Sequence, residues 1–246
     1  MRKPFFIFIL LLITNSVFSN EISAEEILKK MDENYVTETR VATMKMVVHG
    51  RRNSRTIEMK SYSQGTENSF TEYLSPARER GTKMLKLENN LWIYSPTTDR
   101  IIKISGHMLH QSVMGSDLSY EDLMDEDELL DDYTAKVTNE LTFKGNDCWE
   151  LYLLGKKNDL AYAKRIILVD KEKFLPLKQE LYGLSGTLLK EIIVEEAFKI
   201  DNRWYPKHLI FRDVLKKSKG TEIFFDSIEI NVDIPKSKLS KASLRK

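Results

Sequence analysis

The chain has 246 residues, a formal net charge of +1 and 30% charged residues of both signs. This balance excludes the basic stripe of a nucleic-acid surface, and the length fits one domain with a hydrophobic core. The single cysteine, Cys148, excludes an intramolecular disulfide. Because Cys148 lies in an apolar run, we expect a buried, inert thiol rather than a nucleophile or a metal ligand.

The first nineteen residues are predicted to be a cleaved export signal. Arg2 and Lys3 form a basic start, residues 4–14 are almost entirely apolar, and residues 17–19 fit a signal-peptidase site. The alternative, an uncleaved membrane anchor, needs about 20 apolar residues, more than this run supplies. We therefore expect a periplasmic protein in which residues 20–246 form a single domain.

A helix is predicted directly after the signal. Ser23 and Glu26 have the spacing of a capping box, in which each side chain bonds the other residue's backbone N–H. Ile27, Met31 and Tyr35 then repeat every four residues and form one apolar stripe. Such a stripe requires another element to cover it.

From Val41 onward the apolar period changes from that of a helix to two, which predicts antiparallel strands separated by turns rich in Gly, Asn, Asp and Pro. The first strands contain Met44 to Val48, Ile57 to Met59 and Leu85 to Leu87. Later strands are predicted at residues 134–141, 147–154, 163–170, 177–182, 188–198, 204–212 and 222–232. The fold class that follows is mainly β: one strongly curved, unclosed antiparallel barrel with helices over it.

The concave side of such a sheet can hold an apolar ligand. The phase of each strand predicts which side chains face the concave side. In residues 91–94 both faces are apolar, and we favour Trp92 and Tyr94 as the residues on the concave side. The predicted cavity residues are Met44, Met46, Ile57, Met59, Leu85, Leu87, Trp92, Tyr94, Met108 and Met114.

The segment Gly106 to Tyr133 interrupts the strand pattern. Residues 119–130 have helical spacing with acidic residues on one face. Gly106 and Gly115 allow hinge motion, which predicts a helical lid over the cavity; a static loop packed on the barrel end is an equally good interpretation. The acidic face also suits docking on a basic partner.

No catalytic or metal site is predicted. The acidic run at residues 117–132 lacks the glycine of a calcium loop, and His107 and His110 have no clear third ligand. The chain has no nucleophile elbow, phosphate loop or dinucleotide fingerprint. We expect a protein without cofactor that is not an enzyme.

Six further motifs lie at residues 74–82 (LSPARERGT), 91–100 (LWIYSPTTDR), 114–123 (MGSDLSYEDL), 162–165, 176–180 and 204–207. Together these motifs resemble the LolA-like family of outer-membrane lipoprotein-sorting proteins. The third is the most specific, and its family positions are Met114, Gly115, Ser116, Asp117, Tyr120, Glu121 and Asp122. For Asp117 we favour a helix-capping role and for Gly115 and Ser116 a turn.

The resemblance implies an unclosed barrel like those of LolA, LolB and LppX, whose concave face accepts acyl chains of lipoproteins or lipids in the periplasm. Any arginine that holds the lid would be Arg40, Arg78 or Arg80, with no motif to choose among them. The function predicted is a monomeric carrier toward the outer membrane, with an inner-membrane transporter and an outer-membrane acceptor as partners and no nucleic acid. The alternative is an accessory protein that docks on an inner-membrane transporter of the RND type and carries nothing.

Overall fold

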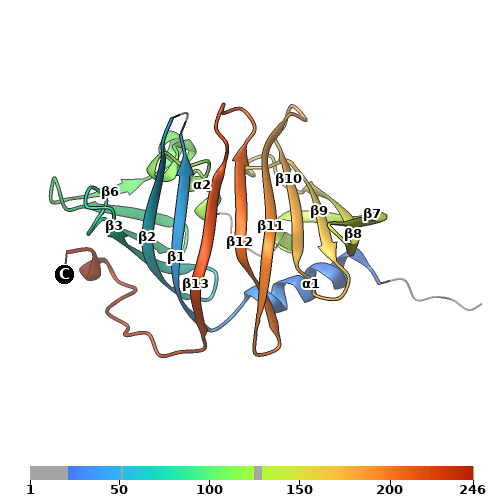
Figure 1. The fold of residues 1–246 in the computed structure, drawn as a ribbon, viewed down its shortest axis with the longest axis horizontal. Helices are drawn as coiled ribbons and strands as arrows, with labels where there is room; N and C mark the ends of the chain where they lie inside the picture. Colours follow the sequence, from blue (N-terminus) through green and yellow to red (C-terminus); the bar gives the residue numbers. More distant parts are fainter. Residues whose placement is uncertain (1–21, 51, 125–128, 246) are drawn as a thin grey trace, which may run out of the picture.

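The structure, a computed structural model, describes residues 22–50, 52–124 and 129–245. The predicted export signal lies outside these residues. The described strands form one 13-stranded antiparallel sheet in the order β6-β5-β4-β3-β2-β1-β13-β12-β11-β10-β9-β8-β7. Because β6 and β7 are the two ends of this order, the sheet curves without closing into a barrel (Figure 1). The predicted fold class is confirmed.

The strands of the first half are β1 (Thr39–His49), β2 (Ser54–Gln64), β3 (Asn68–Ser75), β4 (Lys83–Leu87), β5 (Asn90–Ser95) and β6 (Arg100–Ile104). Those of the second half are β7 (Tyr133–Phe143), β8 (Asn146–Gly155), β9 (Lys164–Asp170), β10 (Pro176–Tyr182), β11 (Leu188–Ile200), β12 (Arg203–Asp213) and β13 (Thr221–Ile230). All seven strands predicted for the second half are present, with ends shifted by a few residues.

Short helices connect or cover the strands. They are α1 (Ala24–Tyr35), α2 (Tyr120–Met124) and α3 (Leu129–Asp132), with the 3-10 helices η1 (Gly106–His110), η2 (Val113–Gly115) and η3 (Lys241–Arg245). The helix predicted at 119–130 is present as α2 and α3, and residues 125–128 between them lie outside the description. No described helix has the length and apolar character needed to cross a membrane.

Helix α1 confirms its prediction. Ser23 Oγ accepts a hydrogen bond from Glu26 N at 3.1 Å, and Glu26 Oε2 accepts one from Ser23 N at 3.1 Å. The apolar stripe, with Ile27 and Leu28 fully buried, packs on side chains of β8 and β9 such as Leu151. Burying each such side chain contributes about 1.5–3 kcal/mol. Figure 1 shows α1 crossing below the β7–β12 half of the sheet.

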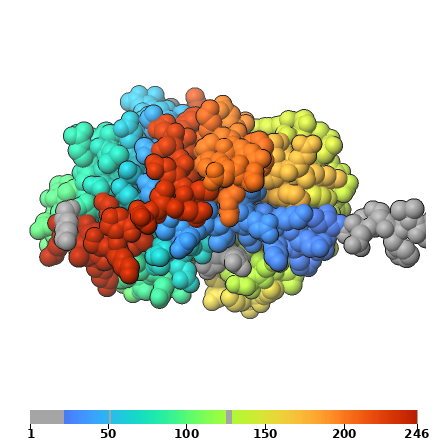
Figure 2. Space-filling model, turned by 90° about the horizontal axis from the view of Figure 1, so that it is seen from below, coloured from blue at the N-terminus to red at the C-terminus, as the bar shows by residue number. Residues whose placement is uncertain are grey.

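The outer face of β3 to β5 is covered by the end of the chain. After β13 the backbone turns back, and Leu244 of η3 is fully buried against Phe70 and Leu85. In Figure 2 this red segment lies on the surface beside the teal strands. The sheet is therefore apolar on both faces in this region.

This cover corrects the predicted phase of β4 and β5. Leu85, Leu87, Trp92 and Tyr94 belong to the outer cluster around Leu244 instead of facing the concave side. Their alternation is regular, but with both faces apolar it does not mark which one is concave.

Candidate functional site: a covered cavity

A cavity of about 450 Å³ lies on the concave face, bounded by the sheet, by α1 and by the segment between β6 and α3. Its volume is within the range of about 300–1,000 Å³ that small-molecule sites occupy. Much of the wall is apolar, and methionine recurs along it, with Met31, Met44, Met46, Met59 and Met84. Flexible thioether side chains allow such a wall to repack around ligands of different shape.

The predicted cavity residues divide into three groups. Met44, Met46 and Met59 line the cavity. Ile57 is fully buried in the cluster behind them, and Met108 and Met114 are half-buried against the same cluster. The other four residues, which belong to β4 and β5, lie on the outer face of the sheet.

Sequence reasoning missed the wall residues that β4 and β5 do contribute. Met84 and Lys86 of β4 and Leu91 of β5 line the cavity. Met84 and Lys86 share one face of β4 and alternate with Leu85 and Leu87, but a face that carries a lysine is typical of a solvent face. The covering of the opposite face by residues near the C-terminus left no trace in the local pattern.

The segment from Gly106 to Met124, here called the lid, covers one side of the cavity and contributes Val113, Leu118 and Leu123 to its wall. It contains η1, η2 and α2 and forms a bridge between Ser112 and Ser119.

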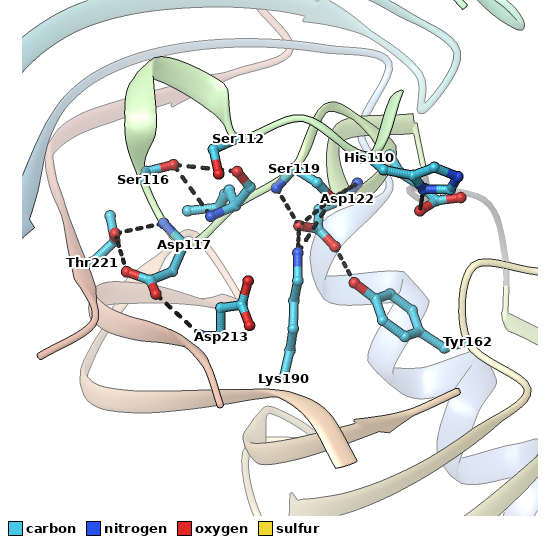
Figure 3. Close-up of polar contacts among 12 residues, drawn as sticks. His110, Ser112, Ser116, Asp117, Ser119, Asp122, Tyr162, Lys190, Asp213 and Thr221 are labelled. Carbon is cyan, nitrogen blue, oxygen red and sulfur yellow. Dashed lines mark hydrogen bonds and ion pairs between the residues drawn. The ribbon is translucent and has the colours of Figure 1, made fainter. Parts of the chain in front are cut away.

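Asp117 ties the lid to the β12–β13 turn. Its side chain is only 2% exposed, and it accepts hydrogen bonds from Thr221 Oγ1 at 2.8 Å, Ser218 Oγ at 2.7 Å and Asp213 N at 3.2 Å. Thr221 Oγ1 also accepts from Asp117 N at 2.9 Å. Figure 3 shows this group at the left of the close-up.

The predicted capping role of Asp117 is wrong. The cap of α2 is Ser119, whose Oγ accepts from Asp122 N at 3.3 Å while Asp122 Oδ2 accepts from Ser119 N at 2.6 Å. Asp117 lies too early to serve this helix and is turned toward β13 instead. The predicted turn at Gly115 and Ser116 is present, with a positive φ of 71° at Gly115.

Asp122 makes the second tie. Its carboxylate accepts hydrogen bonds from the Lys190 ammonium of β11 and from the Tyr162 hydroxyl, and from Ser119 Oγ at 2.8 Å (Figure 3). Lys190 also donates to Ser119 Oγ at 3.2 Å. Because Asp122 and Lys190 are both buried, removing either partner leaves an uncompensated charge in an apolar wall.

The arginine that contacts the lid is Arg55, which the sequence did not single out. Its Nη2 donates to the Met114 carbonyl, and its Nη1 lies 3.0 Å from Glu79 Oε1. Of the three predicted candidates, Arg78 is exposed, Arg80 donates to Leu74 O at 3.0 Å, and Arg40 lines the cavity.

The remaining motif residues lie at the surface of the lid or inside it. Tyr120 is half-buried against the cavity cluster, and Glu121 Oε2 lies 2.8 Å from His110 Nδ1. His107 is exposed. In the ranges that the structure describes, no group of three His, Cys, Asp or Glu residues has a geometry suited to a metal ion.

The acidic face predicted for docking is partly engaged within the molecule. Asp122 points inward to Lys190 and Asp132 pairs with Lys157 Nζ at 2.6 Å. Residues 125–128 of that face lie outside the described residues.

With this geometry established, comparison with known proteins identifies the family. Residues 65–246 match a family model whose description reads "Uncharacterized protein". The chain belongs to this family. No curated protein matches it in sequence.

Solved structures with the same fold cover nearly the whole chain. A DUF1329 family protein from Desulfovibrio piger has a TM-score of 0.83 at 24% identity, over 90% of this chain and 97% of the other. A domain described as an outer membrane lipoprotein-sorting protein from Vibrio parahaemolyticus has a TM-score of 0.79 at 24% identity, over 91% and 100%. A LolA superfamily protein from Nitrosomonas europaea has a TM-score of 0.75 at 24% identity, over 90% and 99%. The fold implied by the motif resemblance is thereby confirmed.

Proposed function

We propose that this protein is a periplasmic, non-catalytic carrier that shields the acyl chains of lipoproteins or lipids during transfer toward the outer membrane. The observation that carries the proposal is the methionine-walled cavity of about 450 Å³ beneath the lid. The lipoprotein-sorting description of one structural neighbour and the LolA superfamily assignment of another support it.

The cavity chemistry suits an acyl chain. Each methylene that leaves water contributes about 0.8 kcal/mol, so roughly ten buried methylenes supply enough to offset the cost of association and of ordering the ligand. No described strand of the sheet pairs with the lid. It is held by side-chain hydrogen bonds that involve Asp117, Asp122, Arg55 and Lys216. Its apolar residues also pack on the cavity cluster, so opening requires breaking these side-chain contacts together.

Export is part of the proposal. Residues 1–19 act as the signal, and residues 20–246 fold outside the cytoplasm as one domain. The transporter-docking alternative stays a prediction, to be tested by charge reversal at Asp125, Glu126 and Asp127. A docking role predicts weaker and less salt-sensitive binding to the transporter, with lipid uptake intact.

Uptake of a fluorescent fatty acid tests the proposal. Met46→Glu places an unpaired charge in the cavity wall and should abolish uptake. Thr43→Glu is the matched control, because Thr43 faces the opposite side of β1 and lies across from Lys60 of β2. Lipid extraction and native mass spectrometry of protein purified from the periplasm should identify a bound acyl compound. A folded wild-type protein that takes up no acylated probe contradicts the proposal.

A further inference from the structure

One end of the cavity is polar and basic. Across the first half of the sheet, Arg40 lies opposite Ser63, Ser63 opposite Ser69, and Ser69 opposite Lys86. All four line the cavity. With neighbouring strands about 4.8 Å apart, this row, here called the basic row, spans roughly 14 Å from β1 to β4.

Polarity falls off along the strands from the basic row. Two residues further in, the next row contains Ser61 and Thr71, with Thr71 Oγ1 donating to Ser61 Oγ at 3.1 Å. Beyond it, Met44 lies opposite Met59. The cavity therefore has a cationic end bounded by hydroxyl groups and an apolar end walled by methionine.

Lys86 is the buried cation at the β4 end of the basic row. The residue is only 4% exposed, and its ammonium donates to the carbonyl oxygens of Thr66 at 3.1 Å and Met124 at 3.3 Å. An ammonium has three donors, and in the described part of the chain Lys86 has no carboxylate partner within ion-pair distance. A buried cation satisfied only by carbonyls gains from an anion.

The other charged residues of the described cavity wall also favour an anionic ligand. Arg40 makes no ion pair with a described residue, whereas Lys190 is neutralised by Asp122. Arg165 lies over the rings of Tyr133 and Tyr162, at 4.8 Å and 5.5 Å from their centroids. With Asp32 the wall holds two acidic and four basic groups.

We propose that the cavity selects amphiphiles with an anionic head group, a carboxylate or a phosphate, which binds Lys86 and the basic row while the acyl chain extends over the methionine rows. This rests on the carrier function proposed above and narrows its cargo. The acylated cysteine of a lipoprotein carries its chains on neutral ester or amide links with no anionic group beside them. A free fatty acid, with its carboxylate, or a lysophospholipid, with its phosphate, therefore fits better.

Competition against a fluorescent acyl probe compares four ligands of one chain length: palmitate, 1-palmitoyl lysophosphatidate, palmityl alcohol and methyl palmitate. The wild-type protein should bind one or both anionic ligands at least about tenfold more tightly than the neutral pair, as expected for a charge-assisted hydrogen bond. The relative affinity of palmitate and lysophosphatidate then distinguishes a carboxylate source from a phosphate source.

Variants locate the head group. Lys86→Met should weaken the anionic ligands about tenfold and leave palmityl alcohol within about twofold, which also shows that the variant is folded; Lys86→Arg should restore binding in part. Lys45→Met is the control, since Lys45 pairs with Asp226 on the outer face. If Lys86→Met fails to fold, Arg40→Met tests the other end of the row.

Equal affinity of the wild type for acids and alcohol, or unchanged selectivity in the folded variants, overturns the head-group proposal and leaves the carrier function standing. Absence of uptake of all four ligands contradicts the carrier function itself.

Discussion

Individual side chains hold the lid, and the contribution of Asp122 is the most direct to test by substitution. Asp122→Asn removes the charge that compensates Lys190 in the wall, so the free energy of unfolding should fall by about 3 kcal/mol or more. Urea denaturation measures it. Glu121→Gln is the matched control, because its partner His110 has a side chain that is 68% exposed and a pair with an exposed partner is worth about 1 kcal/mol at most. Equal losses in the two variants would show that Asp122 does not stabilise the closed lid.

The pH dependence of stability follows from Glu222. Hydrogen bonds from His49 at 2.6 Å and His208 at 2.7 Å lower the pKa of the Glu222 carboxyl from its ordinary value of 4.5, against the opposing effect of burial. A carboxyl with a lowered folded-state pKa contributes stability above its ordinary pKa and loses it as the pH falls through the folded value.

Glu222→Gln should therefore flatten the acid limb of the stability curve. Between neutral pH and about pH 3, the wild-type protein should lose more unfolding free energy than the variant, with the difference growing below about pH 4.5. Urea titrations at several pH values measure both curves. Parallel curves would contradict the prediction.

For single residues, the sequence predicted which positions of the lid matter better than it predicted what their side chains contact. The motif around Asp117 and Asp122 was recognisable, but their partners Thr221, Lys190 and Tyr162 come from distant strands that no local pattern links. Lys86 was missed because a lysine that alternates with Leu85 and Leu87 predicts a solvent face.

Among the structural elements, the lid is the most important for the proposed function, because its opening would admit the ligand. If it opens to admit ligand, backbone amides of residues 106–124 should exchange with solvent faster in the free protein than with palmitate bound. Amides of β11 and β12 serve as the internal reference. Equal and slow lid exchange in both states would leave entry through an open edge of the sheet.

The segment after β13 is predicted to be a structural element in its own right. Leu244→Ala empties a fully buried site against Phe70 and Leu85 and should cost about 2–5 kcal/mol of unfolding free energy. Leu215→Ala, at a residue 68% exposed, should change it by less than about 0.5 kcal/mol. Thermal or urea unfolding of both variants checks this.

A helix or strand was predictable from the sequence to the extent that the interactions that determine it come from residues near it in the chain. Helix α1 is set by its own capping box and stripe, and the sequence predicted it fully. β4 and β5 were predicted as strands but in the wrong phase, since their phase depends on a cover more than a hundred residues away. The helical interruption of the strands between β6 and β7 was predicted, while the side chains that hold it were not, and its opening stays a prediction.

For the whole molecule, the apolar periodicities were sufficient to predict an unclosed, curved antiparallel sheet. They were not sufficient to predict the order of its strands. In each half of the sheet, strands that follow one another in sequence lie side by side. The pairing of β1 with β13, which joins the halves, has no sequence signal of its own. The cavity exists because of that join, since its wall includes Met46 of β1 and Ile223 of β13, directly opposite each other.

The same join governs the order of events when the chain folds. Arg40 pairs with Ile230, so the pairing of β1 with β13 at the centre of the sheet cannot form before β13, the last described strand, is available. Contacts so distant in sequence slow folding, and until β13 arrives, β1 is an unprotected edge carrying methionines. We therefore expect a newly synthesised chain to pass through a period as two half-sheets, during which self-association competes with completion of the sheet.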